Sequence, residues 1–414
     1  MTTGQRQILF LPFLAGCEPV VPPALEIGAE DPVWDPASLP IFRLTLPADW
    51  EAQLTAIIPT DSCAERGTIL GSLDYENPQS GETEAYSDVA FRYRGHTALD
   101  DPEKRFGLKL LFDTVDPDQR FHEMQNVNLL GSEGDDSLLR ERTAQLLMDR
   151  LGVPAPRLNH GRVYVNDAFQ GLFPIAEEPD DQAFLDAHFD DPSGHLYKVE
   201  GYCGGQADFL YESEDTGDYD TMYEAKAGTL PEDVLADLLP MIRCASGLSG
   251  DLATCLPDSV DVDAWLAEMA VDAAMPDVDG LAGAGQNFMI YADPASLRLV
   301  VYPWDKDQAF RTTDLASSSI FDFHPPWATP PPVTLSMRQL WSAEYCDLVD
   351  RAADEALDLD ETVGALAAFL EPYAAEDAYL IEHDWAAQVA DLRATLADRA
   401  AEAKAEADVC NASG

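Results

Sequence analysis

Residues 299–310, LVVYPWDKDQAF, join a run of strand-forming residues to two carboxylates one residue apart. β-Branched and aromatic side chains favour a buried strand, and the prolyl residue Pro303 marks its end. The backbone is rigid at the end of such a strand, and the side chains that follow can face a cleft. We therefore expect Asp305 to lie at the edge of a sheet, in a position suited to holding a metal ion.

The residues before this stretch predict a hairpin that turns at Asp293-Pro294. Because a hairpin returns the chain to its starting point, Asp305 should lie near the preceding acidic loop. The polar residues brought together are then Asp277, Asp279, Asn287, Asp305 and Asp307. Carboxylate and amide oxygens without His or Cys suit a hard cation such as Mg²⁺. A solvated acidic surface is the alternative, but the apolar elements on either side favour a site.

Positive charge is concentrated in one part of the chain. Five of the 25 basic residues lie between positions 92 and 109: Arg92, Arg94, Lys104, Arg105 and Lys109. In a strand, Arg92 and Arg94 share a face, so a strand pair with a basic loop could cover a polyphosphate. Ion pairs with neighbouring acids such as Asp100 and Asp101 are the alternative.

The composition excludes one class of partner. The chain has 414 residues, 46% of them hydrophobic, and 76 acidic residues give a formal net charge of −51. Such a chain can form a large core, but its 25 basic residues against 76 acidic ones argue strongly against binding to duplex nucleic acid, whose phosphates must be neutralised by Lys and Arg. The acidity is typical of a solvated surface, and the alternative is a cationic substrate.

The first 17 residues, MTTGQRQILFLPFLAGC, resemble a bacterial lipoprotein signal, which is cleaved before a lipid-modified cysteine. We expect residues 18–40, rich in Pro and acid, to form a linker from Cys17 to the folded body. Membrane contact would then be through the lipid alone, with the protein at the outer membrane or cell surface. The alternative is an ordinary buried amino-terminal segment.

Six cysteines besides Cys17 form an even set, compatible with three disulfides in an oxidising compartment. The pair Cys244–Cys255 brackets a short loop and is the most plausible local bridge. The other pairings remain open at this point.

The order of the expected elements favours an α+β fold, because strands dominate the first part of the chain and residues 335–406 are helical. A hairpin is expected to turn at Asn166-Asp167. The stretch 135–154 carries helix caps at both ends and leucines at helical spacing.

Several motifs occur in an order that resembles the CotH family of spore-coat-type atypical protein kinases. They are RYRGHTALDDPEKRFGLKLLF (92–112), NLL (128–130), VYVNDAFQGLFPIAEE (163–178), LYK (196–198), DVDG (277–280) and PWDKD (303–307). The resemblance implies a kinase-like two-lobed α+β fold with a helical C-terminal part. It would span residues 41–406, with an N-terminal lobe at 41–200 and a C-terminal lobe at 201–406.

The resemblance also implies roles for individual residues, in a protein that binds ATP with Mg²⁺ or Mn²⁺. Asp279 would be the catalytic acid that orients the acceptor hydroxyl. The metal would be held by Asn287 and Asp305, with Asp307 as a further candidate. The nucleotide-binding candidates are Lys104, Lys109, Glu177 and Lys198, together with Arg94 from the strand pair described above. The chain departs from the family pattern at His96-Thr97 and at Glu103. We expect these two departures to bear on the affinity for the nucleotide.

Two functions follow from these patterns. The first is an exported kinase that transfers the γ-phosphoryl group of ATP to Ser or Thr of a protein, for which the acidic chain favours a basic acceptor. The second is a catalytically weak or inactive surface lipoprotein that acts as an adhesin or a structural envelope protein. Retention of Asp279, Asn287 and Asp305 together favours the enzyme.

Overall fold

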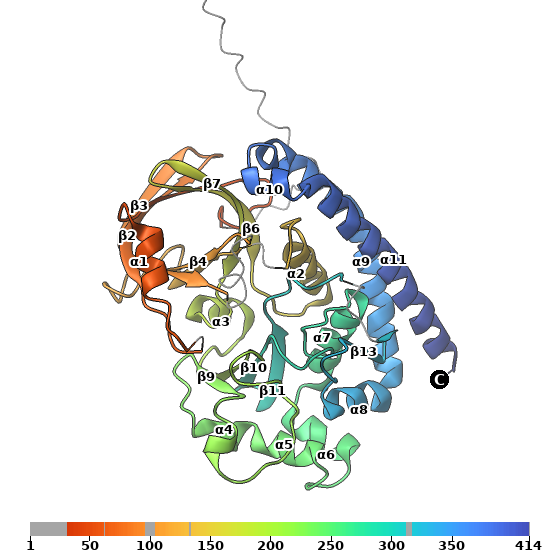
Figure 1. Cartoon of the computed structure of the whole chain (residues 1–414). Coiled ribbons are helices and arrows are strands. Elements are labelled where there is room, and N and C mark those ends of the chain that lie inside the picture. The colour runs from red at the N-terminus through yellow and green to blue at the C-terminus, as the bar shows by residue number, and fades with distance from the viewer. Residues whose placement is uncertain (1–30, 62, 96–103, 132–133, 312–316, 414) are drawn as a thin grey trace, which may run out of the picture.

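The structure is a computed structural model that describes residues 31–61, 63–95, 104–131, 134–311 and 317–413. Its N-terminal half forms a closed barrel with the strand order β1-β2-β3-β4-β5-β7-β6 (Figure 1). The strands are β1 (Ile41–Thr45), β2 (Ile69–Asn77), β3 (Glu82–Arg94), β4 (Gly107–Leu111), β5 (Asn126–Leu129), β6 (Leu158–Val165) and β7 (Ala168–Glu177). Parallel pairing of β1 with β6 closes the barrel, and all its other pairs are antiparallel.

A second sheet lies beside the barrel. It has the order β11-β10-β8-β9, formed by β8 (His195–Val199), β9 (Glu224–Lys226), β10 (Phe288–Asp293) and β11 (Arg298–Pro303). The strands β10 and β11 form the hairpin that the sequence predicts, with Phe288 opposite Pro303. A small third sheet pairs β12 (Ser317–Ser319) with β13 (Asp322–His324).

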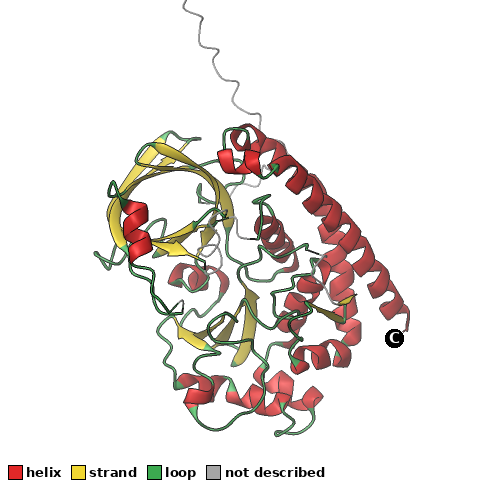
Figure 2. Ribbon diagram, in the orientation of Figure 1, coloured by secondary structure: helices red, strands yellow, loops and turns green. Residues whose placement is uncertain are grey.

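The longest helices lie together on one side of the molecule (Figure 2). There α9 (Ser342–Ala374) and α11 (Trp385–Ser413) run side by side, and α10 (Ala378–Glu382) lies between them in the chain. Two shorter helices, α2 (Arg140–Leu151) and α7 (Val262–Ala274), pack against α9. The remaining helices are α1 (Trp50–Ala56), α3 (Gln182–His188), α4 (Asp233–Asp237), α5 (Leu239–Ala245), α6 (Leu252–Ser259) and α8 (Pro332–Leu340), with a 3₁₀ turn at Thr216–Asp218.

The expectation of a kinase-like two-lobed α+β fold is wrong. The N-terminal strands close into a seven-stranded barrel, and the second sheet and C-terminal helices complete the molecule. Closure depends on contact between residues 41–44 and 162–165, far apart in the chain. Local sequence patterns carry no signal for a pairing of this kind.

The segment 31–40, predicted to be part of a linker, is packed onto the barrel. Val33 and Trp34 are buried in the barrel cluster. The side-chain amide of Asn159 donates hydrogen bonds to the carbonyl groups of Val33 and Asp35. The folded body therefore includes residues 31–40, which we assigned to the linker. The predicted signal segment and Cys17 lie outside the described residues.

Three disulfides join the remaining cysteines. Cys244–Cys255 is the local bridge that the sequence predicts, and the others are Cys63–Cys203 and Cys346–Cys410. Disulfides of this kind indicate an oxidising environment. Within the described residues, the helices include none with the length and apolar character needed to span a membrane.

Candidate active site between the barrel and the second sheet

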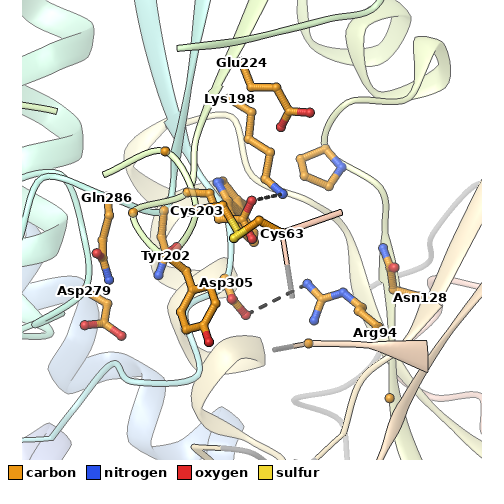
Figure 3. Close-up of a pocket in the computed structure, with 18 of the residues that line it drawn as sticks. Cys63, Arg94, Asn128, Lys198, Tyr202, Cys203, Glu224, Asp279, Gln286 and Asp305 are labelled. Atoms are coloured by element: carbon orange, nitrogen blue, oxygen red, sulfur yellow. Dashed lines mark ion pairs between the residues drawn. A yellow bond between two sulfur atoms is a disulfide. The ribbon is translucent and has the colours of Figure 1, made fainter. Parts of the chain in front are cut away.

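A large pocket of about 1280 Å³ lies where the outside of the barrel meets the second sheet (Figure 3). One wall comes from β3, β4 and β5, and the opposite wall comes from the ends of β8, β9, β10 and β11. Its lining contains both acidic and basic side chains. The volume is sufficient for a nucleotide-sized ligand.

The barrel wall presents a polar row because side chains in its strands alternate in direction. Apolar residues such as Phe91 and Leu108 are buried in the barrel core. In the strand register, Arg92 of β3 lies opposite Lys109 of β4, and Lys109 lies opposite Asn128 of β5. All three line the pocket. The predicted strand pair therefore carries its positive charge on the outer face of the barrel.

Lys109 has a close acidic partner in Glu178, which follows β7. Its ammonium lies 2.6 Å from a Glu178 carboxylate oxygen, which also accepts a hydrogen bond from the amide of Asn128. Burial on its own would raise the pKa of Glu178, but the charge of Lys109 and these hydrogen bonds hold that pKa well below its usual range. Glu178 is therefore ionised and fixes the position of Lys109.

The facing wall holds Asn287 and Asp305 at the open end of the β10–β11 hairpin. Asn287 directly precedes β10, and the backbone N–H of Trp304, just after β11, donates to the Asn287 carbonyl at 3.1 Å. Asn287 and Asp305 both line the pocket, as does Asp307. The structure thus brings together the residues that the sequence predicts around the hairpin.

Asp279 lies on the loop after α7 and also lines the pocket. Its backbone N–H donates to the carboxylate of Asp277 at 3.1 Å. Burial, followed by the charges of Asp277 and Asp305, raises the pKa of Asp279 to about 7. A carboxyl group with such a pKa can accept or donate a proton near neutral pH.

Arg94 links the two walls, and Lys198 lies against an aromatic side chain of the second wall. Arg94 at the end of β3 approaches Asp305, with 3.9 Å between the guanidinium and a carboxylate oxygen (Figure 3). The ammonium of Lys198 lies 4.1 Å from the ring centroid of Trp304 and 3.7 Å from the carboxylate of Glu200. Both cations are placed where they could contact a polyphosphate.

Two of the five nucleotide-binding candidates do not line the pocket. Glu177 turns to the other side of β7, where Arg157 contacts its carboxylate at 2.5 and 3.0 Å. The neighbouring Glu178 occupies the pocket instead. Lys104 lies outside the lining and is 3.7 Å from Asp136. His96 and Glu103 lie outside the described residues.

Glu141 was not predicted from the sequence, although it lies in the first turn of α2 and lines the pocket. Burial and the nearby charge of Asp305 raise the pKa of Glu141 to about 8. An acid in the first turn of a helix is ordinarily explained by the helix dipole, so its position gave no functional signal. For Glu178 the only available signal was strand alternation, which does not say which of two adjacent acids faces a cleft.

The donor groups fit a divalent cation shared with a nucleotide. Within the described parts of the chain, no three His, Cys, Asp or Glu side chains already converge at metal-binding distance. Mg²⁺ is commonly held by only one or two carboxylates, with phosphate oxygens and water as its other ligands. Burial contributes most to the raised pKa values of Asp279 and Glu141, and the neighbouring charge of Asp305 raises both further; a cation would offset that charge. Asn287, Asp305 and Asp307 are the oxygen donors of the lining that would hold it at the end of the hairpin.

The Cys63–Cys203 disulfide crosses the same region (Figure 3). Cys63 follows α1 on the barrel side, and Cys203 lies on the loop between β8 and β9. Both cysteines line the pocket. The bridge therefore ties together the two parts of the molecule that form the walls.

Two comparisons with known proteins were informative about this chain. A search of curated proteins found no match to this chain. The family model described as CotH kinase protein matches residues 91–401, which includes both walls of the pocket and most of the chain. The chain therefore belongs to the CotH kinase protein family.

Proposed function

We propose that this protein is an ATP-dependent kinase that transfers the γ-phosphoryl group to Ser or Thr of a protein. The observation that carries the proposal is the meeting of Asp279, Asn287 and Asp305 with basic side chains of the barrel in one large pocket. Membership of the CotH kinase protein family supports the same reaction. The chain's strong negative charge favours a basic acceptor protein.

In this proposal the basic and the acidic side chains of the pocket have separate tasks. Arg94, Lys109 and Lys198 bind the phosphates, and Asn287 and Asp305, with Asp307 as a further candidate, hold Mg²⁺ or Mn²⁺. The metal, when bound, neutralises charge on the phosphates. Asp279 accepts a hydrogen bond from the acceptor hydroxyl and orients its oxygen toward the phosphorus. Glu178 keeps Lys109 in place, and Glu177 has no task at the site.

The location of the protein is a second part of the proposal. The three disulfides are compatible with export, and Cys17 would carry a lipid that anchors the chain. A Cys17→Ala variant should move from the membrane fraction to the soluble exported fraction of its host. Recovery of the uncleaved wild-type chain, with Met1 intact, would contradict this part without affecting the reaction.

The reaction is tested with the full chain, γ-labelled ATP and Mg²⁺, using a Ser-rich basic protein and the kinase itself as acceptors. The proposal predicts label on Ser or Thr, confirmed by mass spectrometry, and none after EDTA treatment. Thermal unfolding gives an independent test, because a ligand that binds the native state raises Tm. If Mg-ATP neither raises Tm nor labels any acceptor, the adhesin or envelope alternative replaces the kinase.

A further inference from the structure

A buried cation lies directly behind the pocket. Lys306 separates the two acids of the PWDKD motif, but its side chain is only 4% exposed and does not line the pocket. Its ammonium lies 2.6 Å from Asp277, 2.8 Å from Asp272 and 3.5 Å from Glu268. All three carboxylates have fully buried side chains. One cation thus joins the end of β11 to α7 and to the loop that follows it.

The two nearer carboxylates also hold the backbone of that loop. Asp277 uses one oxygen for Lys306 and the other to accept the backbone N–H of Asp279 at 3.1 Å. Asp272 uses one oxygen for Lys306 and the other to accept the backbone N–H of Ala282 at 3.2 Å. The ammonium therefore fixes the loop on both sides of its central glycine.

That glycine, Gly280, shows how closely the loop follows the carboxylates. A Cβ added at Gly280 would lie 2.7 Å from an oxygen of Asp277 and closer still to one of Asp272. Neither carboxylate can move away freely, since each is bound to Lys306 at the same time. The path of the loop, and with it the position of Asp279, depends on this contact.

We infer that Lys306 is a positioning residue, which holds the loop bearing Asp279 in register with the strand end bearing Asp305. This inference rests on the proposed kinase function and adds a residue to it. Stability alone explains the cluster poorly, because well-packed apolar residues commonly replace buried ion pairs without loss of stability. Alignment of two functional side chains from different elements does require a fixed connection between them.

Lys306→Met tests the inference, with Lys404→Met as the matched control. Lys404 also contacts two carboxylates, those of Asp350 and Asp354 at 2.7 and 2.8 Å, but it lies on α11 away from the pocket. We expect Lys306→Met to lower kcat about 10²-fold, because misplacement of a reacting group by about 1 Å has that effect. The Kd for Mg-ATP should change less than about threefold, since the phosphate-binding side chains remain. Lys404→Met should leave both quantities unchanged.

Both quantities are measured well below the Tm of each variant, so that a loss of stability alone does not alter kcat. An unchanged kcat in folded Lys306→Met would overturn the inference. So would a Kd that rises in proportion to the loss of kcat, because Lys306 would then act on the metal rather than on Asp279. If Lys306→Met does not fold, Gly280→Ala decides by the same two criteria, because one added methyl group displaces the loop while Lys306 remains. A wild-type protein without kinase activity is a different result, which contradicts the proposed function itself.

Discussion

Asn287 and Asp305 lie on adjoining segments at one end of the β10–β11 hairpin, and both have left-handed backbones, with φ of 56° and 59°. Asn and Asp adopt this conformation more readily than other residues except glycine. The two proposed metal ligands thus owe their direction to backbone geometry that the hairpin imposes.

The Cys63–Cys203 bridge should matter for both stability and binding. It closes a loop with a sequence separation of 140, so its removal should lower the free energy of unfolding by about 5 kcal/mol in the chain-entropy description. Because both cysteines line the pocket, the Cys63→Ser/Cys203→Ser variant should also bind Mg-ATP more weakly, as measured by calorimetric titration.

The control is Cys346→Ser/Cys410→Ser, which removes the bridge between α9 and α11 with a separation of 64. It should lose about 4 kcal/mol of stability and keep its affinity for Mg-ATP. Equal loss of affinity in both variants would mean that the pocket responds to stability in general and not to the bridge across it.

The pair of Lys109 and Glu178 predicts a pH-dependent loss of stability. Since the pKa of Glu178 is held below its ordinary value of 4.5, its ionised form stabilises the fold above that pH, and this contribution is lost as the pH falls further. Glu178→Gln should therefore lower the free energy of unfolding by about 3 kcal/mol at pH 7, as for one broken buried pair. The difference from wild type should shrink below pH 4.5 in urea titrations.

Glu355→Gln is the control, since Glu355 forms an exposed pair with Arg150 at 3.0 Å. It should cost less than about 1 kcal/mol. If the two variants prove equally stable at pH 7, the ion pair of Lys109 and Glu178 does not hold the barrel wall in the way described.

For Asp279 we expect the opposite effect of pH on stability. Its pKa is raised from 3.8 to about 7, so the ionised carboxylate destabilises the metal-free fold, and this penalty grows as the pH rises from about 4 to 7. Asp279→Asn should become more stable than wild type over that range, by on the order of 2 kcal/mol at pH 8 after allowance for partial exposure. Unfolding in EDTA at pH 5 and pH 8 measures the effect.

Asp360→Asn serves as a control with the opposite expected effect, because Arg393 holds the pKa of Asp360 below its usual value. That variant should lose stability relative to wild type above pH 4. If the stability of Asp279→Asn relative to wild type does not increase between pH 5 and pH 8, the pKa of Asp279 is not raised in the folded protein.

Local patterns were sufficient for several parts of the structure. The turn at Asn166-Asp167 was predictable because both residues tolerate positive φ, and they have φ of 49° and 65°. The β10–β11 hairpin and the Cys244–Cys255 bridge were likewise set by residues close in the chain. These predictions required no knowledge of the overall topology.

The barrel and part of the site depend on contacts that sequence patterns do not report. Closure requires β1 to pair with β6, and the pocket requires the outer face of the barrel to meet a separate sheet. The choice between Glu177 and Glu178 depends on which side of β7 faces that sheet. Glu141 joins the site only because α2 packs beside the end of β11.

If Asp305 holds the metal and Asp279 orients the hydroxyl, their replacements should impair the kinase in different ways. Asp305→Asn removes a charged ligand, and we expect weaker Mg²⁺-dependent ATP binding together with lost transfer. Asp279→Asn leaves the metal ligands in place, and we expect near-normal binding while transfer falls by about 10²–10⁴.

The most direct measurement is calorimetric titration of Mg-ATP into wild type and both variants, beside transfer of labelled phosphate at saturating Mg-ATP. We expect Asp279→Asn to bind Mg-ATP like wild type with transfer reduced by about 10²–10⁴, and Asp305→Asn to bind Mg-ATP weakly or not at all. Equal loss of binding in the two variants, or wild-type transfer by Asp279→Asn, would contradict this expectation.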